Sequence, residues 1–480
     1  TLKWLRAPWK NIQWSCRSMD PRTLEHIAKW VDGKVHGVGT ATVTRVVTDS
    51  RAILRGEFFV ALRGEHFDGH AFLPAVWEAE AGGALVSEVN LRLSGLPQIE
   101  VQDTLSALQS LAKGYRNELR LKAIGVTGSS GKTSTKEMIT AILRERFSVA
   151  KTVGNYNNHI GLPLSVLGAS CTDEAGVFEM GMNHAGELAP LCEIARPDVA
   201  VITNVGIAHI GHLGTREAIA KEKAVVAEAI PAEGIVVLNA NDEFTDWMAA
   251  RCKARVIRAG LKLGDLQARN IEHTDKGVNF TLAYGAVSRR VALPVHGEHM
   301  VTNACLAAAV GVGLGLTLEE CEAGLAKTTI PGNRLKIQRL GRVLVINDAY
   351  NANPESMVAA LRTAAHFGVK GRRVAALGRM GELGEQSEVS HRRVGRAVVE
   401  CEFDHLITVG DEAGLMAEAA TSAGLKSTQQ AKTHEQAIEA LLDYLEPGDL
   451  LLVKGSLSSA MDRIVAGLEA AKSQAKWRSA

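Results

Sequence analysis

Residues 125–138, GVTGSSGKTSTKEM, combine glycines, Lys132 and several hydroxyl side chains, as a phosphate-binding loop does. The apolar run 121–128 predicts a buried strand before the loop, and residues 133–146 predict a helix after it. Glycines let backbone N–H groups approach phosphate oxygens, and a helix N-terminus adds positive potential. The pattern G-x-x-x-x-G-K-[ST] fails at one position, because Val126 occupies the place of its first glycine. The stretch therefore predicts a phosphate loop; the alternative is a glycine-rich turn without a ligand.

The side chains of this loop suggest which parts of a nucleotide they would meet. Lys132 can reach the β and γ phosphates, and the Thr133 hydroxyl can ligate Mg²⁺. The remaining loop positions would surround the phosphates with small groups: Gly128, Ser129, Ser130, Gly131 and Ser134.

Outward from the loop, strands and helices alternate. Apolar runs predict further strands at 176–182, 199–205 and 234–240, with helices between them, which favours a parallel sheet covered on both faces. Residues 270–295 alternate in polarity and predict an antiparallel appendage. Residues 299–316 predict a closing helix, and residues 328–334 a linker.

Two further α/β units flank this centre. Before it, residues 58–62 and 83–87 predict strands, with a helix at 71–81 between them. After the linker, four apolar strands end in polar or glycine residues. Since ligands bind at the carboxyl ends of such strands, four side chains should lie at one sheet edge: Asp348, Arg379, Asp411 and Lys454.

The length of 480 residues agrees with about three domains of roughly 150 residues each. We predict an α/β protein with an extension outside the fold at 1–18 and domains at 19–115, 116–330 and 331–480. The extension is basic and carries three tryptophans, and we expect it to be dispensable; a short amphipathic membrane contact is the alternative.

Composition excludes several classes of protein. The net charge of +1 gives no global field that would recruit nucleic acid or an anionic membrane. No apolar run reaches the roughly 18 residues of a membrane span. The seven cysteines are scattered and never spaced C-x-x-C, which favours reduced thiols in a cytoplasm over disulfides or a zinc site.

Three stretches carry polar groups that the fold alone does not require. Glu179 lies inside an apolar strand, where it could face solvent, pair with a lysine or serve a site. His209 and His212 follow a strand and could be ligands or ordinary loop hydrogen-bonding groups. Lys221 and Lys223, two apart on a predicted helix, should point to different faces. Taken alone, each lysine is most simply a solvated charge.

These stretches occur together with others in an ordered set of motifs from residue 47 to residue 456. The chain resembles the Mur ligases of peptidoglycan synthesis, and most closely the branch that adds D-alanyl-D-alanine to UDP-N-acetylmuramoyl-tripeptide. The motifs that carry the resemblance are VTDSR (47–51), FFVALRGEHFDGHAF (58–72), GSSGKTSTKEM (128–138), GNYNNHIGLPLSVL (154–167), FEMGMNHAGEL (178–188), NVGIAHIGHLG (204–214), NDAYNANPESM (347–357), LGRMGELGE (377–385) and LLVKGS (451–456).

The resemblance implies roles around the phosphates. Lys132 and Thr133 would serve ATP and a first Mg²⁺, with Glu179 as a further metal ligand and His209 as a ligand of a second Mg²⁺. Lys223 matches the lysine that the family carbamylates with CO₂. A carbamate is an anionic oxygen ligand that a hard cation accepts, which explains a lysine near metal.

The resemblance also assigns the substrates. Asn303, Arg334 and Asp348 would hold adenine, phosphate and ribose, and Ser50 and Arg51 the uridine diphosphate. Residues facing the muramyl-peptide or the incoming dipeptide would be Asn157, Asn158, Tyr350 and Asn351. The first domain would bind the UDP-substrate, the second ATP, and the third would complete the ligase.

The implied reaction is ATP-dependent peptide bond formation through an acyl phosphate, by a monomer in the bacterial cytoplasm, without nucleic acid or stable membrane insertion. Three positions depart from the family: Met300 replaces Asn, Arg379 replaces Asp, and Leu457 replaces Arg. One alternative is a sister ligase that adds a single amino acid, but the chain has no DNPR-type signature of that step. A second alternative is a non-catalytic binder of UDP-muramyl-peptides. A third is a generic phosphate-loop switch or motor, but this function would leave the first domain without a role.

Overall fold

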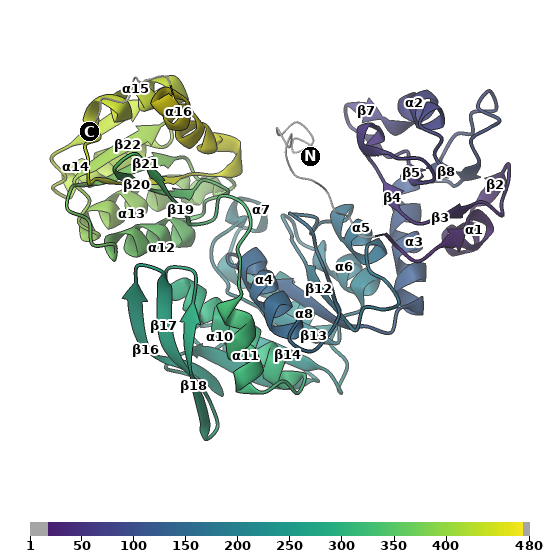
Figure 1. The fold of residues 1–480 in the computed structure, drawn as a ribbon, viewed down its shortest axis with the longest axis horizontal. Helices are drawn as coiled ribbons and strands as arrows, with labels where there is room; N and C mark the ends of the chain where they lie inside the picture. The colour runs from purple at the N-terminus through teal and green to yellow at the C-terminus, as the bar shows by residue number, and fades with distance from the viewer. Residues whose placement is uncertain (1–17, 474–480) are drawn as a thin grey trace.

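The structure, a computed structural model, describes residues 18–473 and confirms the predicted α/β fold class. Figure 1 shows three units, with the first and the C-terminal unit on opposite sides of the central one. The predicted extension lies outside the described residues apart from Ser18. We propose that the units correspond to 19–115, 116–330 and 331–480.

The first unit has a five-stranded sheet in the order β2-β9-β8-β5-β4. The two predicted strands are neighbours in it, and Phe58 pairs with Gly83 in parallel. The predicted helix 71–81 is shorter, because a 3-10 turn at Gly69–Phe72 precedes it. The elements are β1 (Arg22–Thr23), α1 (Leu24–Val31), β2 (Lys34–His36), β3 (Thr42–Val43), β4 (Val46–Val47), β5 (Phe58–Val60), β6 (Arg63–Gly64), β7 (Phe67–Asp68), α2 (Leu73–Glu78), β8 (Gly83–Val86), β9 (Gln98–Glu100) and α3 (Thr104–Glu118).

The central unit has a nine-stranded sheet in the order β11-β12-β10-β13-β14-β15-β16-β17-β18. The strand before the phosphate loop, β10, therefore lies between two parallel neighbours, buried as predicted. The elements are β10 (Lys122–Thr127), α4 (Lys132–Leu143), β11 (Val149–Lys151), α5 (Gly161–Leu167), β12 (Ala175–Glu179), α6 (Leu188–Ala195), β13 (Val199–Ile202), α7 (Ile210–Leu213), α8 (Arg216–Glu228), β14 (Ile235–Asn239), α9 (Thr245–Ala249), β15 (Arg255–Leu261), β16 (Leu266–Thr274), β17 (Gly277–Tyr284), β18 (Val287–Leu293), α10 (Glu298–Gly313) and α11 (Leu318–Ala326).

The segment expected to form a separate antiparallel appendage instead continues the central sheet. Strands β16 to β18 are antiparallel, as predicted, but β16 also pairs in parallel with β15, from Ala259 and Leu266 onward. Their inward side chains, such as Val278 and Val291, share one apolar cluster with helix α10. The helix thus covers strands of both kinds, and one core spans the junction.

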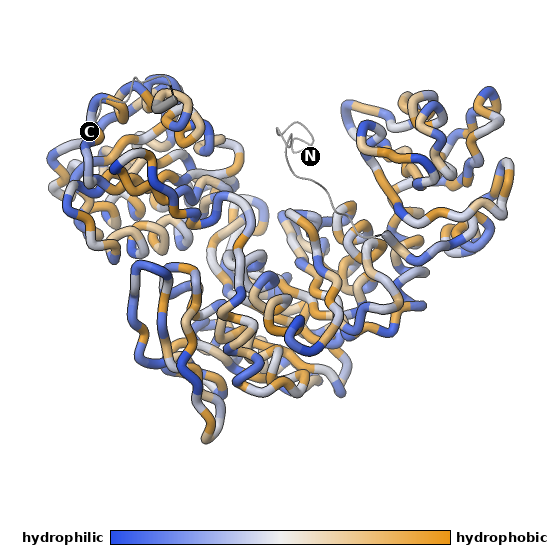
Figure 2. The backbone as a smooth tube through the Cα atoms, in the orientation of Figure 1, coloured by the Kyte–Doolittle hydropathy of each residue, from blue (hydrophilic) through white to orange (hydrophobic). Residues whose placement is uncertain are grey.

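The C-terminal unit has a six-stranded sheet in the order β19-β20-β24-β21-β22-β23. Figure 2 shows hydrophobic residues along its inner strands. Asp348 and Lys454 are register partners at the carboxyl ends of β20 and β24, so the predicted meeting of polar side chains at this edge is confirmed for them. The elements are β19 (Lys336–Leu340), β20 (Val343–Asp348), α12 (Pro354–Ala365), β21 (Arg373–Gly378), α13 (Ser387–Glu400), β22 (His405–Val409), α14 (Gly414–Ser422), β23 (Thr428–Ala431), α15 (His434–Tyr444), β24 (Leu450–Lys454) and α16 (Asp462–Ser473).

Helix α3 joins the first unit to the central one. Its buried Tyr115 donates a hydrogen bond to the Ala169 carbonyl oxygen at 2.7 Å, and its Arg116 donates to the Ala195 carbonyl oxygen at 2.7 Å. The Asp20 carboxylate accepts hydrogen bonds from the Cys171 backbone N–H at 2.7 Å and from the Ser170 hydroxyl. These contacts fasten both ends of the first unit to the central unit.

Candidate active site

The phosphate loop has the predicted strand–loop–helix context, between β10 and α4. Gly128 and Gly131 adopt φ of +149° and +79°, which glycine tolerates best. A Cβ at Gly128 would also collide with the Thr203 hydroxyl. That hydroxyl donates to the Ser130 carbonyl oxygen at 2.5 Å, so the loop is held against the end of β13. The loop is therefore a fixed turn at the start of a buried helix.

Lys132 folds back over this loop. Its ammonium donates to the Gly128 carbonyl oxygen at 2.7 Å. Burial lowers the pKa of Lys132, nearby Glu179 opposes that change, and Arg334 adds to it. A cation held over a glycine-containing loop at a helix N-terminus suits nucleotide phosphates.

Glu179 is the polar centre beside the loop and is only 2% exposed. It accepts a hydrogen bond from the Thr133 hydroxyl at 2.9 Å and another from the Asn157 amide at 2.8 Å. The Lys136 ammonium lies 3.9 Å from the carboxylate. Of the alternatives, exposure to solvent is wrong for this carboxylate. Three predicted site residues, from α4, β12 and the segment before α5, thus meet at one point.

Lys223 differs sharply from its neighbour Lys221 on α8. Lys221 is exposed, whereas Lys223 is 1% exposed, so the expectation of different faces is confirmed. Among residues 18–473, no hydrogen-bond or ion-pair partner contacts the Lys223 ammonium. Burial and the charge of Lys132 hold the pKa of Lys223 well below its ordinary value. The interpretation as a solvated lysine therefore holds for Lys221 and is wrong for Lys223.

His209 precedes the short helix α7 and has a left-handed φ of +64°. Its Nδ1 lies 2.5 Å from the carboxylate of Glu382, in the C-terminal unit. Burial lowers the pKa of His209, Glu382 opposes this, and Lys132 and Lys223 add to it. The imidazole therefore belongs to the same charged neighbourhood as both lysines. Local sequence offers no reason to single out Glu382.

The C-terminal unit supplies side chains to the loop. The Arg334 guanidinium donates to the Thr133 hydroxyl oxygen at 3.3 Å and stacks 3.6 Å from the centre of the Tyr350 ring. The Asn353 amide, which also caps α12, donates to the Ser130 hydroxyl at 2.8 Å. Neither Asn353 nor Glu382 was predicted. Asn353 reaches the loop, and Glu382 reaches His209, only after two distant parts of the chain have docked.

Two further predicted nucleotide residues border this region. The Asp348 carboxylate accepts from the Leu335 backbone N–H at 3.0 Å and pairs with Lys454 at 2.6 Å. The side chain of buried Asn303 lies against the phosphate loop, since a Cβ at Gly131 would be 2.7 Å from its Oδ1. Asn351 accepts from Lys454 through its carbonyl oxygen at 2.9 Å.

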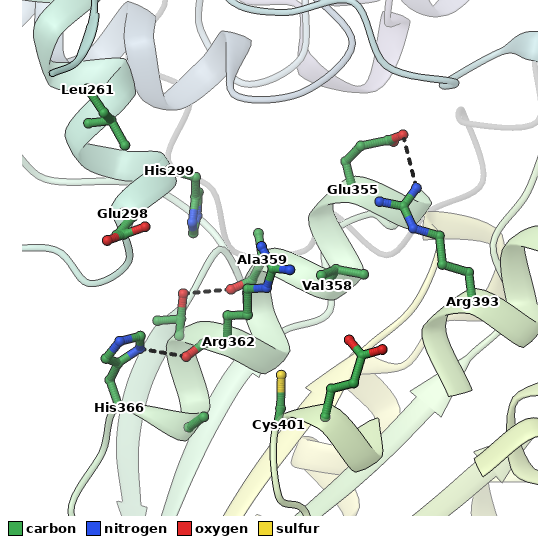
Figure 3. Close-up of a pocket in the computed structure, with 13 residues that line it drawn as sticks. Leu261, Glu298, His299, Glu355, Val358, Ala359, Arg362, His366, Arg393 and Cys401 are labelled. Atoms are coloured by element: carbon green, nitrogen blue, oxygen red, sulfur yellow. Dashed lines mark hydrogen bonds and ion pairs between the residues drawn. The ribbon is translucent and has the colours of Figure 1, made fainter. Parts of the chain in front are cut away.

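A cavity of about 640 Å³ lies between α10 and the C-terminal helices α12 and α13. Figure 3 shows His299 beside it, with Glu355 and Arg393 facing each other across its rim. Burial lowers the pKa of His299 to about 4. One oxygen of Glu355 is buried without a hydrogen-bond partner in the described part of the chain, although Arg393 lies 3.9 Å from the other oxygen.

The structure does not bring every predicted residue to the loop. Ser50 and Arg51 lie on a 3-10 turn of the first unit, where the 78% exposed Arg51 side chain pairs with Asp49 at 2.7 Å. Asn158 makes a local contact, because its Oδ1 accepts from the Gly161 backbone N–H at 2.8 Å, at the start of α5.

The three positions that depart from the family have ordinary contacts. Met300 is buried, with its sulfur 3.7 Å from the Asn303 amide nitrogen. Arg379 donates to the Ser458 hydroxyl at 3.0 Å. The backbone N–H of Leu457 donates to Asn351 Oδ1 at 3.3 Å. None of these contacts disturbs the group around Thr133.

The donor set at the loop suits a hard cation. Thr133 and Glu179 place two oxygen donors 2.9 Å apart beside the phosphate site, and oxygen ligands are those that Mg²⁺ prefers. Within residues 18–473 no three His, Cys, Asp or Glu side chains are grouped as a metal site. The six cysteines in that range are free, and none of its helices could cross a membrane.

A phosphate loop, a buried carboxylate and a loop-facing arginine from a separate α/β unit define a nucleotide-using protein of several domains. Comparison with known proteins agrees. Residues 126–311 match the Mur ligase middle domain and residues 333–457 the Mur ligase, glutamate ligase domain. The chain belongs to the Mur ligase family, in the group of UDP-N-acetylmuramoyl-tripeptide–D-alanyl-D-alanine ligases (MurF).

Individual relatives cover nearly the whole chain. The ligase of that name from Bacillus subtilis is 35% identical, over 94% of this chain and 99% of its own length. The one from Escherichia coli is 36% identical, over 93% and 98%. The crystal structure of MurF from Acinetobacter baumannii matches with a TM-score of 0.87 at 33% identity, over 94% and 99% of the two chains. MurF from Thermotoga maritima, in complex with ADP, matches with a TM-score of 0.80 at 27% identity, over 90% and 98%.

Proposed function

We propose that this protein joins D-alanyl-D-alanine to UDP-N-acetylmuramoyl-tripeptide at the expense of ATP, in peptidoglycan synthesis in the bacterial cytoplasm. One observation carries the proposal. The Thr133 hydroxyl contacts Glu179 of the central sheet and Arg334 of the next unit at once. A phosphate bound at the loop would therefore lie next to side chains of both units. The names of the relatives indicate the substrates.

The nucleotide would lie with its phosphates on residues 128–134. Lys132 would neutralise charge that develops on the transferred phosphoryl group, and Arg334, which contacts Thr133, would add a second cation. Asn303 lies against Gly131 and would meet the adenine, and Asp348 would meet the ribose. The complex of the Thermotoga maritima relative with ADP supports nucleotide binding by this chain.

Metal ligands would come from Thr133, Glu179 and His209, and from Lys223 as a carbamate, for two Mg²⁺ ions. When bound, Mg²⁺ supplies a Lewis acid that offsets phosphoryl charge. The Lys223 amine would attack CO₂, forming an N–C bond and releasing a proton, and this requires a neutral amine. The buried, unpartnered position of Lys223 disfavours its ammonium form, which supports the proposal.

The muramyl-peptide would bind across two units. The exposed Arg51 guanidinium beside Ser50 can meet the uridine diphosphate, because its planar fork matches phosphate oxygens. Asn157 already contacts Glu179, so the peptide end would arrive next to the metal ligands, with Asn158 near it. Tyr350 and Asn351, from the C-terminal unit, would face the substrates.

The reaction would have two steps. The terminal carboxylate of the tripeptide attacks the γ-phosphorus of ATP, giving an acyl phosphate and ADP. The amine of D-alanyl-D-alanine then attacks the acyl carbon, the C–O bond to phosphate breaks, and phosphate and a proton leave. Docking of the C-terminal unit on the loop would exclude water from the hydrolysable acyl phosphate. The protein would act as a monomer.

Phosphate release tests this function. We expect release from ATP to require UDP-N-acetylmuramoyl-tripeptide together with D-alanyl-D-alanine, and to produce the UDP-linked pentapeptide. Single amino acids, such as D-glutamate or diaminopimelate, serve as controls. Turnover with one of these in place of the dipeptide would assign the chain to a sister activity, and binding of the UDP-peptide without turnover would make it a non-catalytic binder.

A further inference from the structure

One contact links the chemistry of the central unit to the position of the C-terminal unit. His209 Nδ1 and the Glu382 carboxylate lie 2.5 Å apart although 173 residues separate them in sequence. His209 stands at the start of α7, and Glu382 stands between β21 and the 3-10 turn Gly384–Gln386. The pair therefore forms only while the two units are docked.

The backbone around this pair is packed as closely as glycine allows. The Gly211 N–H donates to the Glu382 carbonyl oxygen at 3.0 Å. A Cβ at Gly211 would lie 2.8 Å from the Gly384 nitrogen and 3.0 Å from that same carbonyl oxygen. Gly211 has no positive φ, so only this close approach requires glycine there.

Both members of the pair are held in an unfavourable backbone conformation. His209 has φ of +64° and Glu382 has φ of +63°, in the left-handed region that is strained for a residue with a side chain. Such conformations persist when their surroundings over-determine them. The surroundings here are the docked loops themselves, together with the His184 and His212 rings, whose centres lie 4.5 Å apart and whose planes are tilted by 48°.

The pairing also decides which nitrogen of His209 is available. A carboxylate only accepts hydrogen bonds, so Nδ1 carries the hydrogen and Nε2 keeps its lone pair. A carboxylate in this position commonly fixes the tautomer and ring orientation of a metal-binding histidine. We infer that Glu382 is a positioning residue, which sets the tautomer and orientation of His209 for metal binding only when the C-terminal unit is docked. This rests on the proposed function, in which His209 is a metal ligand.

Mn²⁺ binding in the presence of a non-hydrolysable ATP analogue tests the inference without the ligase substrates. We expect Glu382→Ala to weaken Mn²⁺ binding by roughly 10- to 100-fold, measured by electron paramagnetic resonance. Glu382→Gln keeps an acceptor oxygen and should lose less. Glu385→Gln, an exposed acid three residues along, is the matched control and should bind as the wild type does. Wild-type affinity in Glu382→Ala, with normal circular dichroism, would overturn the inference.

Gly211→Ala tests the dependence on docking while leaving both side chains intact. Its methyl group should push the loops apart, raise the radius of gyration of the nucleotide complex in small-angle scattering, and weaken Mn²⁺ binding as Glu382→Ala does. Gly368→Ala, where a Cβ meets nothing within 4 Å, is the control. Unchanged Mn²⁺ affinity in Gly211→Ala would overturn the coupling. Because these measurements need neither muramyl-peptide nor dipeptide, they stand or fall separately from the phosphate-release assay.

Discussion

The Lys454 ammonium donates to the Asp348 carboxylate over 2.6 Å, at the adjacent carboxyl ends of β24 and β20. Both groups are buried, so removal of one leaves a buried charge without its ion-pair partner. We predict that Lys454→Met lowers the free energy of unfolding by about 3 kcal/mol, measured by urea denaturation. Lys426→Met, at an exposed position, should change it little. A similar, small change in both variants would show that the pair contributes nothing to stability.

Lys132→Ala should abolish ATP turnover and leave the fold intact. The ammonium is held over the phosphate loop by the Gly128 carbonyl oxygen. Loss of a positioned cation in phosphoryl transfer should reduce kcat by on the order of 10³-fold. Steady-state phosphate release measures this, and circular dichroism checks the fold. Near-normal turnover by a folded variant would remove Lys132 from the mechanism.

The local sequence was enough to predict the features that depend on residues close together in the chain. The loop, its strand and helix, and the edge that carries Asp348 and Lys454 follow from apolar runs that end in polar residues. The contacts of Glu382 with His209 and of Asn353 with Ser130 could not be predicted, because they span 173 and 223 residues and depend on how two units dock. Buried Lys136, which lies near Glu179, was not predicted as a site residue. It could have been, because it follows Lys132 by one helical turn and therefore lies on the same face of α4.

Lys223→Ala should be nearly inactive, whereas Lys221→Ala should keep most activity. Lys223 is buried beside the charge of Lys132, whereas Lys221 is exposed. The two variants therefore remove the same side chain from a buried and from an exposed position of one helix. Bicarbonate should restore activity to wild-type enzyme depleted of CO₂, and small carboxylates should partly restore Lys223→Ala. If Lys221→Ala is inactive and Lys223→Ala is active, the carbamate is on Lys221 and our assignment is wrong. If both variants are active, the proposal of a carbamate is refuted.

Arg51→Ala should raise the KM for the UDP-linked peptide and leave that for ATP nearly unchanged. The Arg51 guanidinium is exposed on the first unit, and it pairs with Asp49 of the same turn. Arg55→Ala, four residues along and also exposed, is the control. Initial rates with each substrate varied in turn measure the effect. An equal rise in both KM values would mean that Arg51 is structural.

His299 should make stability depend on pH between its ordinary pKa of 6.5 and its folded pKa of about 4. In that window the unfolded chain binds a proton at His299 that the folded chain does not, so the free energy of unfolding falls as the pH is lowered. The full effect would be at most about 3 kcal/mol. Urea denaturation from pH 7 to pH 4 should show a smaller fall in His299→Gln. Parallel curves for both proteins would contradict this.

The first unit and the C-terminal unit are attached to the central unit in different ways. Tyr115 and Arg116 bond to central-unit carbonyl groups, and Asp20 ties the other end of the first unit to Ser170 and Cys171. The C-terminal unit lies on the opposite side of the central unit (Figure 1). It meets the phosphate loop through two polar contacts, of Arg334 with Thr133 and of Asn353 with Ser130. We infer that the first unit stays fixed on the central unit, whereas the C-terminal unit can move away from the phosphate loop. We therefore expect a long UDP-linked substrate to stay clamped in place while spent nucleotide is exchanged on the other side.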